Sequence, residues 1–339
     1  MAETVQRYNA GTQRAKGLLE MASALYDTSL SHETVRPGRR QIDSRVGTRV
    51  TLSLEAVPGR LPDAVSVSFR AGGFRAALEA VARGEVSLQW INPSAAVTMA
   101  VAGTGPFAEP LPLRAIAVMP SPDQIGFAVT GDSGLRSLAD IKEQRFPLKV
   151  SLRGNRSHTV HLFIRELLSA AGFSLDDVEA WGGEVRYDND TPTKNPNRTG
   201  AVERGEADAI FDEAVRGWTE EALGLGMRAL PIDGPVLERL EALGFRRGTM
   251  PKAAYPSLPS DLQTIDYSGF IVYTHADVSD DIVRGVCTAL EARKDRIPPD
   301  TGEGPLPLDL MCKDTIEGPL GIPLHPAAER FWREQGYLS

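Results

Sequence analysis

The sequence predicts an α/β protein built from two lobes, and three observations support this prediction. The chain has 339 residues, 42% of them hydrophobic, which is long for one compact core and sufficient for two. Short apolar runs alternate with amphipathic helical stripes, an order typical of mostly parallel sheets with helices on both faces. A strand–helix–strand pattern also occurs twice, once in each half of the chain.

The first copy of this pattern begins at residue 65. Residues 65–69 are rich in β-forming side chains, and residues 74–81 carry apolar side chains at helical spacing. Gly84 is suited to end that helix, because glycine adopts the left-handed conformation found at many helix C-termini. Residues 86–91 then form a second apolar run. The segment is therefore predicted to be strand, helix and strand.

The second copy begins at residue 148. Residues 148–152 are predicted to be a strand, residues 154–158 a polar loop, and residues 160–171 a helix that ends at Gly172. In both copies an Arg-Gly-Glu segment precedes the last strand, and superposing the two segments aligns Asn92 with Glu213. The repeat suggests two related lobes whose carboxyl strand ends face a common cleft, where open α/β sheets bind ligands.

The chain is predicted to cross twice between the lobes. Residues 113–118 and 125–130 are strand-like and flank a proline-rich turn, which suits a first crossing. Residues 230–233 and 269–274 are both predicted to be short apolar strands, and the return crossing is expected between them, around residues 232–268. A helix over residues 279–296 follows. We therefore expect lobe I to comprise residues 1–123 and 269–339, and lobe II to comprise residues 124–268.

Composition excludes several function classes. A net charge of -8 and a pI near 5.3 argue against a nucleic-acid partner, which would require a basic face. No apolar run approaches the roughly 20 residues of a membrane helix, so direct membrane insertion is not expected. Cys287 and Cys312 form no metal or redox motif. Nucleotide-binding, nucleophile and zinc motifs are missing, so no cofactor, metal or catalytic residue is assigned.

Seven segments, in this order and spacing, resemble the TAXI family of TRAP transporter solute-binding proteins. They are VSVSFRAGG (65–73), GEVSLQWINPSAA (84–96), LRAIAVM (113–119), SGLRSLADIK (133–142), RGNRSH (153–158), RGEADAIFDEA (204–214) and LHPAAERFWREQG (324–336). The resemblance implies a type II periplasmic-binding-protein fold, in which two lobes close by hinge motion around a small carboxylate or amino acid. It also implies TRAP membrane subunits as partners.

The start of the chain departs from that family. Charged residues are scattered through the first thirty residues, residues 11–27 suggest a helix, and no export signal precedes them. The sequence as given therefore predicts a cytoplasmic location, and a periplasmic one if the start has been trimmed.

Candidate ligand-binding residues follow the predicted strand ends. Gly72 and Gly73 precede a helix whose N-terminal amides are suited to hold an anion, or they form a tight turn that requires positive φ. In the other lobe an arginine, an amide, a hydroxyl and an imidazole crowd a helix start: Arg153, Asn155, Ser157 and His158. A guanidinium binds carboxylates through two hydrogen bonds. His158 is otherwise a solvent-facing residue of the first helical turn.

The remaining candidates are Asn92, Ser94 and Glu213. Asn92 and Ser94 follow one strand end and offer hydrogen bonds to a ligand. Glu213 is a candidate for holding an amino group, or it pairs with Arg216 or Arg153 in a structural ion pair, as Asp212 would.

Three functions remain open: a solute-binding protein, an enzyme of decarboxylase or dehydratase type on the same fold, and a ligand sensor. In the enzyme alternative, His158 with Asp212 or Glu213 would exchange protons.

Overall fold

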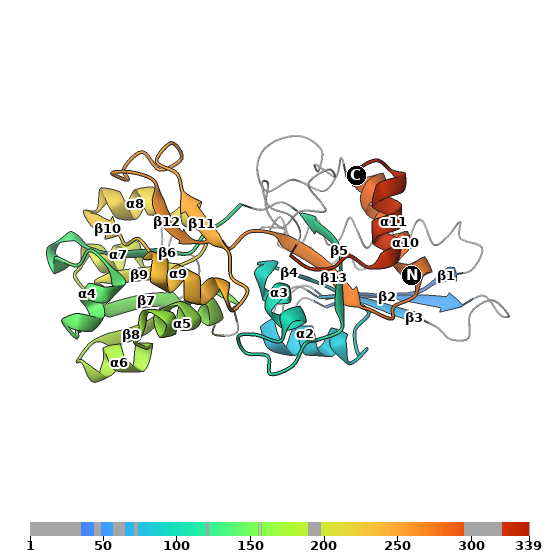
Figure 1. Ribbon diagram of the computed structural model, residues 1–339, viewed down its shortest axis with the longest axis horizontal. Helices are drawn as coiled ribbons and strands as arrows, with labels where there is room; N and C mark the ends of the chain where they lie inside the picture. Colours follow the sequence, from blue (N-terminus) through green and yellow to red (C-terminus); the bar gives the residue numbers. More distant parts are fainter. Residues whose placement is uncertain are drawn as a thin grey trace, which may run out of the picture.

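The computed structural model describes residues 35–43, 49–56, 65–70, 74–119, 122–154, 156, 158–188, 198–294 and 321–338. These residues form two lobes joined by two thin connections (Figure 1). We use lobe I for the part that contains β1 to β5, β13, α2, α3, α10 and α11. Lobe II is the part that contains β6 to β12 and α4 to α9.

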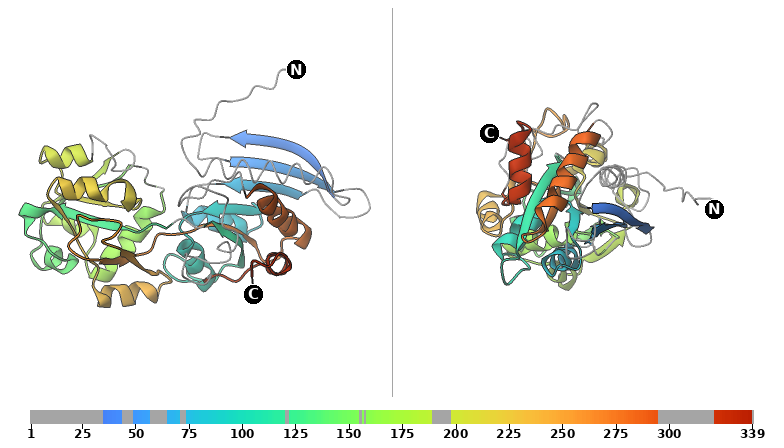
Figure 2. Two further views of the ribbon diagram at one scale, coloured as in Figure 1. Left: turned by 90° about the horizontal axis from the view of Figure 1, so that it is seen from above. Right: turned by 90° about the vertical axis from the view of Figure 1, so that its right-hand side faces the viewer.

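Lobe I is assembled from the first and the last described elements of the chain. Its strands are β1 (Val35–Asp43), β2 (Arg49–Ala56), β3 (Val65–Arg70), β4 (Leu88–Ile91), β5 (Leu113–Met119) and β13 (Phe270–His275), and its helices are α2 (Phe74–Ala82), α3 (Ala95–Ala102), α10 (Asp280–Arg293) and α11 (Pro326–Glu334). The strands β1, β2 and β3 form an antiparallel sheet, and β13 lies antiparallel between β4 and β5. Helices α2 and α3 lie on one side of the β4-β13-β5 sheet, and α10 and α11 lie on the other (Figures 1 and 2).

The C-terminal helix α11 is positioned by polar contacts at both ends. Before its first turn, Nδ1 of His325 accepts a hydrogen bond from the Ala327 N–H at 3.2 Å, and His325 Nε2 lies 3.1 Å from the carbonyl oxygen of Val278. In its last turn the indole N–H of Trp332 donates to the carbonyl oxygen of Ile116 at 2.8 Å. Burial lowers the pKa of His325. His325 is therefore a buried packing residue at the start of α11.

Lobe II is built on a five-stranded sheet in the order β10-β6-β9-β7-β8. Its strands, with a separate β11-β12 hairpin, are β6 (Gly126–Thr130), β7 (Lys149–Arg153), β8 (Glu184–Asp188), β9 (Ala209–Asp212), β10 (Met227–Ala229), β11 (Arg247–Met250) and β12 (Leu262–Ile265). Its helices are α4 (Leu138–Glu143), α5 (Val160–Ala171), α6 (Leu175–Ala180), α7 (Thr199–Glu203), α8 (Thr219–Gly224) and α9 (Gly234–Glu241), with short 3-10 turns η1 (Gly131–Ser133) and η2 (Val215–Gly217).

Both faces of this sheet are buried, because successive residues of a strand point to opposite faces. Phe127 and Phe211 join the larger core, where their ring centroids lie 4.1 Å apart. Ala128 and Ile210, one position along each strand, join a second core with Trp218. The central strands are therefore apolar throughout, as is typical of sheets covered on both sides.

Local sequence signals set the ends of several helices in lobe II. Ser137 and Ser174 each form a capping box with an aspartate three residues later, which satisfies N–H groups at the starts of α4 and α6. Gly172 ends α5 with φ of 87°, a left-handed conformation that glycine adopts without steric cost. Asp233 caps α9 by accepting from the Val236 N–H at 2.8 Å.

Two connectors link the lobes, and they run side by side. We define the first connector as residues 122–125, which lead into β6, and the second as residues 266–269, which lead from β12 into β13. An antiparallel bridge joins Gln124 to Asp266, and the Ile125 N–H donates to the carbonyl oxygen of Ile265 at 3.1 Å. The two connectors therefore form one hydrogen-bonded ribbon.

The predicted fold class is confirmed: sheets flanked by helices form two lobes joined by two connectors, the type II periplasmic-binding-protein-like arrangement. In lobe II, β7, β8, β9 and β10 run in one direction. Only β6, which enters from lobe I, opposes them, and β13 likewise opposes β4 and β5 in lobe I. The boundaries at 123/124 and 268/269, and a ligand cleft between the lobes, stay predictions.

One predicted strand is wrong. Residues 230–233 lie outside the regular elements, and the neighbouring strand β10 is shorter and ends at Ala229. Leu230 and Ile232 are buried, and their N–H groups donate to the carbonyl oxygens of Phe127 and Gln263. Because these hydrogen bonds go to two different strands, residues 230–233 form no strand of their own. They are an irregular segment that lies between β6 and β12, with alternate apolar side chains buried. Residues 234–265 then form α9 and the β11-β12 hairpin.

No helix among the described residues is both long enough and apolar enough to cross a membrane.

Substituting Gly126→Ala should destabilise the protein by about 1–3 kcal/mol through overpacking. A Cβ atom at Gly126 would lie 2.8 Å from both Trp218 Cζ2 and Val215 Cγ1, in a fully buried part of lobe II. Gly234→Ala is the matched control, because no atom lies within 4 Å of its added Cβ. Chemical denaturation of both variants measures the difference, and equal stabilities would contradict tight packing around Gly126.

Candidate functional site

The candidate site lies where β7 and β9 end, next to the first connector. These strands run parallel, so the residues that follow them gather at one edge of the sheet. Gly126, the first residue of β6, pairs with Asp212, the last residue of β9. The carboxyl ends of β7 and β9 therefore face the point where the chain enters lobe II.

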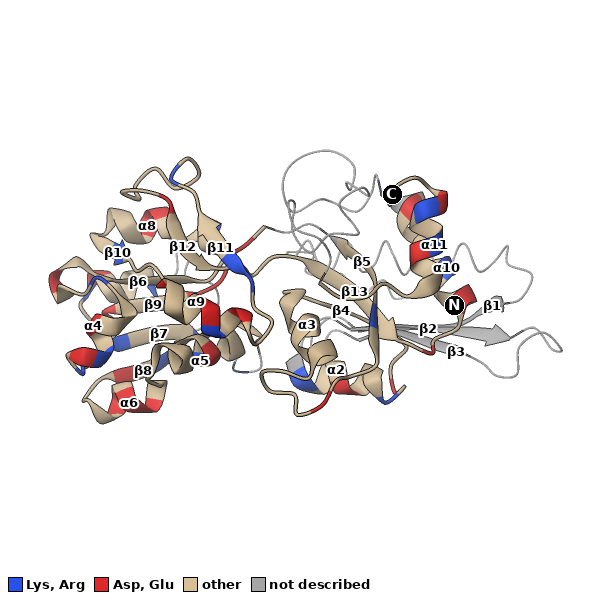
Figure 3. Ribbon diagram, in the orientation of Figure 1, with Lys and Arg blue, Asp and Glu red and all other residues tan. Residues whose placement is uncertain are grey.

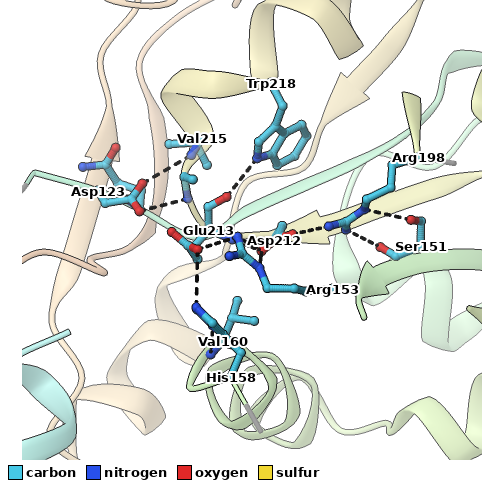
Figure 4. A network of polar contacts seen from close by, with 12 residues as sticks. Asp123, Ser151, Arg153, His158, Val160, Arg198, Asp212, Glu213, Val215 and Trp218 are labelled. Carbon is cyan, nitrogen blue, oxygen red and sulfur yellow. Dashed lines mark hydrogen bonds and ion pairs between the residues drawn. The ribbon is translucent and has the colours of Figure 1, made fainter. Parts of the chain in front are cut away.

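Asp212 lies at the centre of the site and is fully buried between two arginines (Figure 4). Its Oδ1 accepts hydrogen bonds from Nε and Nη2 of Arg153 at 3.0 and 2.9 Å, and its Oδ2 pairs with Nη1 of Arg198. Arg198 also donates to Ser151, from Nε to the hydroxyl at 3.0 Å and from Nη2 to the carbonyl oxygen at 3.1 Å. The buried charges are therefore paired and hydrogen-bonded.

The two arginines respond differently to their surroundings. Burial alone would lower the pKa of Arg153, but the Asp212 and Glu213 carboxylates outweigh it, so the pKa is raised. At Arg198 burial prevails over its pairing with Asp212, and the pKa is lowered. Arginine remains protonated in proteins. Both guanidinium groups therefore stay charged.

Glu213 extends the network toward the start of α5. Its carboxylate pairs with Nη2 of Arg153, and its Oε1 lies 3.9 Å from Nε2 of His158. The Nδ1 atom of His158 accepts the N–H of Val160 at 3.3 Å, so Nε2 faces the carboxylate. The indole N–H of Trp218 donates to the Glu213 carbonyl oxygen at 3.0 Å. Glu213 is thus fixed by its main chain and its side chain.

Asp123, in the first connector, reaches the same loop. Its Oδ2 accepts the N–H of Ala214 at 2.9 Å, and its Oδ1 accepts the N–H of Val215 at 3.3 Å. Burial of the carboxyl group and the adjacent Glu213 carboxylate raise the pKa of Asp123 well above its ordinary value. Ala214 has a φ of 57°, which is unfavourable for a residue with a Cβ atom. The connector therefore holds a strained turn.

A second polar cluster holds the other connector. The side-chain amide of Asn92, which follows β4, donates to the carbonyl oxygens of Tyr267 at 3.1 Å and Gly269 at 3.4 Å. The Ser94 hydroxyl donates to the carbonyl oxygen of Ser268 at 3.3 Å and accepts from Nη2 of Arg246 at 3.0 Å. Asn92 and Ser94 are both buried. Lobe I therefore holds the second connector through these two residues.

Arg246 of lobe II binds the same connector and also contacts Ser94. Its Nε and Nη2 donate to Oδ2 of Asp266 at 3.1 and 2.7 Å. Ser268, beyond Asp266, accepts the N–H of Asp123 at 3.0 Å through its hydroxyl oxygen. The second connector is thus bound by residues from both lobes and by the first connector.

The structure brings some of the predicted site residues together and separates others. Arg153, His158 and Glu213 meet at the end of the lobe II sheet, and Glu213 pairs with Arg153 rather than with Arg216. Asn92 and Ser94 contact the second connector instead. Four predicted residues lie outside the described residues: Gly72, Gly73, Asn155 and Ser157. A ligand-binding role for all of these residues stays a prediction.

Sequence analysis missed Asp123, Arg198 and Arg246. Arg198 ends the polar run that begins at Tyr187, and residues 189–197 of that run lie outside the described part. Its charge gave no signal, because arginine in a polar segment is usually exposed, whereas this side chain is fully buried. A proline-flanked aspartate in a predicted crossing was the available signal for Asp123.

Three tryptophans near the sheets differ in their burial. Trp218 and Trp90 are buried, and Trp181 is half-buried against Phe173, with ring centroids 5.8 Å apart. Trp218 and Trp90 therefore belong to the core.

A comparison with protein-family models shows to which family the chain belongs. The model described as the NMT1-like family matches residues 63–336, which is most of the chain. The chain belongs to the NMT1-like family. The matched region of this NMT1-like protein includes every element from β4 to α11 and both connectors.

Solved structures with a similar arrangement are distant from this NMT1-like protein. XAC2383 from Xanthomonas citri bound to ATP is 16% identical, with 77% of this chain and 80% of that chain covered and a TM-score of 0.40. PhnD1 from Prochlorococcus marinus in complex with methylphosphonate is 12% identical, with 68% and 71% covered and a TM-score of 0.36. MatC from Rhodopseudomonas palustris with bound malate is 13% identical, with 66% and 70% covered and a TM-score of 0.36.

Substituting Arg198→Met should lower the free energy of unfolding by about 3–5 kcal/mol, because it leaves part of the buried Asp212 charge uncompensated. Arg204→Met is the matched control, since that arginine is exposed and pairs with Glu206 at the surface. Exposed ion pairs contribute at most about 1 kcal/mol. Urea denaturation measures both variants, and a loss at Arg198 no larger than at Arg204 would contradict the assigned role of Arg198.

Proposed function

We propose that this protein binds a small organic acid or amino acid at the hinge-side edge of lobe II and closes its lobes around it. The observation that carries the proposal concerns Arg153. Its Nε and Nη2 are fixed by Asp212 and Glu213, whereas Nη1 donates no hydrogen bond to the described residues. The side chain is 11% exposed, so the guanidinium is accessible at this edge. A pre-oriented N–H pair on a cation suits a carboxylate ligand.

The surroundings of Arg153 support a ligand with more than one polar group. His158 lies beside the same carboxylate and is 17% exposed. Glu213 and Asp123 add carboxyl oxygens on the connector side, which can accept hydrogen bonds from an ammonium group. An amino acid, which carries both charges, therefore fits this arrangement as well as a simple organic acid does.

The ribbon of two connectors supports closure by a hinge. Relative motion of the lobes would change the backbone at residues 122–125 and 266–269, because β6 begins directly after the first connector and β12 and β13 directly flank the second. The candidate site lies next to this ribbon, so a ligand held there would contact a part of the protein that changes on closure.

The finer assignment is also a proposal. The ordered segments from residue 65 to residue 336 support a TAXI-type solute-binding protein, and TRAP membrane subunits would then be its partners, with the protein outside the cytoplasm. A cytoplasmic location would suit a ligand sensor instead. Copurification with membrane subunits would separate these two functions.

An enzyme on the same fold is the second candidate, and one observation favours it. Nε2 of His158 and Oε1 of Glu213 lie 3.9 Å apart, which is longer than a hydrogen bond but short enough to close on ligand binding. Turnover of the bound compound would support this candidate.

The binding proposal is tested by a thermal-shift screen of small organic acids and amino acids, followed by calorimetry on the compounds that raise Tm. A ligand at about 100 times its Kd should stabilise the protein by about 2.7 kcal/mol. Arg153→Lys keeps the charge but loses the pre-oriented Nη1 donor, so affinity should fall on the order of tenfold to a hundredfold. Mass spectrometry of the ligand after incubation detects conversion.

Arg247→Lys serves as the control, since that exposed arginine pairs with Glu241 away from the site. Its affinity should match that of the unchanged protein. A screen without any binder would contradict the proposed function, and an unchanged Kd in Arg153→Lys would remove Arg153 from the site.

A further inference from the structure

The loop that follows α9 in lobe II ends this helix through two backbone hydrogen bonds and a glycine. The Phe245 N–H donates to the carbonyl oxygen of Leu240 at 3.1 Å, and the Gly244 N–H donates to that of Glu241 at 2.9 Å. Gly244 has a φ of 100°, so these bonds form the motif in which a left-handed glycine terminates a helix. Neither of the two bonds uses the carbonyl oxygen of Leu243.

Lobe I supplies a donor for that carbonyl oxygen. The hydroxyl group of Thr104, in the loop after α3, donates to the Leu243 carbonyl oxygen at 2.5 Å. The last carbonyl groups of a helix have no partner inside the helix, so a side chain of lobe I completes the end of a lobe II helix. Figure 1 shows α3 at the end of lobe I that faces lobe II.

Two further contacts between the lobes lie beside this hydrogen bond. A Cβ atom added to Gly244 would lie 3.3 Å from Cγ of Met99 and 3.6 Å from Cγ2 of Thr98, so α9 and α3 approach closely at the glycine. Arg246 donates from Nη2 to the hydroxyl oxygen of Ser94, just before α3, at 3.0 Å. We use interlobe contact for six residues of this surface. They are Ser94, Met99 and Thr104 of lobe I, and Leu243, Gly244 and Arg246 of lobe II.

The interlobe contact is packed as tightly as the interior of a lobe. Met99 has no exposed surface and belongs to the same hydrophobic cluster as Leu240 and Phe245 of lobe II. The ring of Phe245 packs edge-on against Phe163 of α5, with centroids 4.6 Å apart, and Phe163 packs against Tyr267 of the second connector at 5.0 Å. A change in the angle between the lobes would therefore separate or repack this surface.

The interlobe contact also extends away from the connectors. Ser94, at one end of α3, binds the second connector through Ser268, and Thr104 lies beyond the other end of the helix. The eight residues of α3 make it about 12 Å long. A hydrogen bond at this distance from the connectors opposes rotation about them more effectively than a bond within them, because it acts on a longer lever.

We propose that the interlobe contact holds the two lobes at the angle of this structure when no ligand is bound. The connectors determine where the lobes are joined, and the interlobe contact determines at which angle they rest. The lobes leave this angle only when the Thr104 hydrogen bond breaks and Gly244 separates from Met99. Packed interfaces of this kind switch between discrete arrangements. The proposal concerns the protein without a ligand and goes beyond the proposed binding function.

Two substitutions weaken the interlobe contact in different ways. Thr104→Val removes the hydroxyl group and keeps the shape of the side chain, so the population at other angles should rise about fivefold. Gly244→Leu places a side chain where Met99 and Thr98 lie, so nearly all molecules should leave the angle of this structure.

Each substitution has a matched control. Thr288→Val removes a hydroxyl group that donates to the carbonyl oxygen of Arg284 at 2.8 Å within α10. Gly226→Leu introduces the same kind of backbone strain, since Gly226 has a φ of 81°, but nothing in the described part of the protein beyond its chain neighbours lies within 4 Å of the added Cβ. Both controls should keep the angle of the unsubstituted protein.

The measurement is the distance distribution between two nitroxide labels, one on each lobe, by pulsed electron paramagnetic resonance. The labels are attached to Ala76→Cys in α2 and Glu143→Cys in α4, which are exposed helical positions. Cys312→Ser removes one native thiol, and Cys287 is buried and stays unlabelled. The protein is unfolded, dialysed and refolded beforehand, which removes bound compounds. This labelled parent should give one narrow distribution, and Thr104→Val should add a second.

Circular dichroism shows that each variant is folded before distances are compared. If Gly244→Leu does not fold, the labelled parent and Thr104→Val decide. A broad distribution in the labelled parent would overturn the proposal, because the lobes would already rotate freely. The parent's distribution in Thr104→Val or in folded Gly244→Leu, or a shift in either control, would also overturn it. No ligand is present, so these results leave the binding proposal to the thermal-shift screen.

Discussion

Asp212 has no exposed surface, so its charge must be neutralised inside the protein. Two arginines do this, one from the end of β7 and one from the segment that begins α7. A buried ion pair contributes little net stability, yet removing one partner destabilises the protein strongly, because the other charge is left uncompensated. The two partners must therefore stay at hydrogen-bonding distance and orientation. The positions of Arg153, Ser151 and Glu213 follow from this single requirement, and the candidate site is defined by them.

The same requirement links the site to the hinge. Glu213 follows Asp212 directly, so the loop that carries it is held by the paired carboxylate, and Asp123 from the first connector is placed against that loop. The second connector is then joined to Asp123 through Ser268. Charge neutralisation in lobe II thereby positions the segment about which the two lobes are connected.

Much of this architecture was predictable from the spacing of apolar residues and from the glycines that end helices. The helix over residues 160–171 and the strands at β5, β6 and β7 follow from apolar spacing and glycine stops, which are local properties. Residues 230–233 were wrongly predicted to be a strand. Their side chains alternate between apolar and polar because every second residue is buried against β6 or β12, and a strand of a regular sheet shows the same alternation. Arg153 and Glu213 were identifiable as strand-end residues. Arg198 was not identifiable, because its role depends on Asp212, 14 positions away in the chain. The position of Asp123 in a predicted crossing was a signal, but its partner Ala214, 91 positions away, was not predictable.

The two residues that the sequence repeat aligns, Asn92 and Glu213, both lie next to a connector between the lobes. Asn92 follows a strand of lobe I and binds the second connector, while the loop that begins at Glu213 follows a strand of lobe II and binds Asp123 of the first connector. Each lobe thus binds one of the two connectors through the residues that follow one of its strands. The contacts that hold both connectors thus come from residues beside strand ends, so substitutions on the exposed surfaces of either lobe leave these contacts in place.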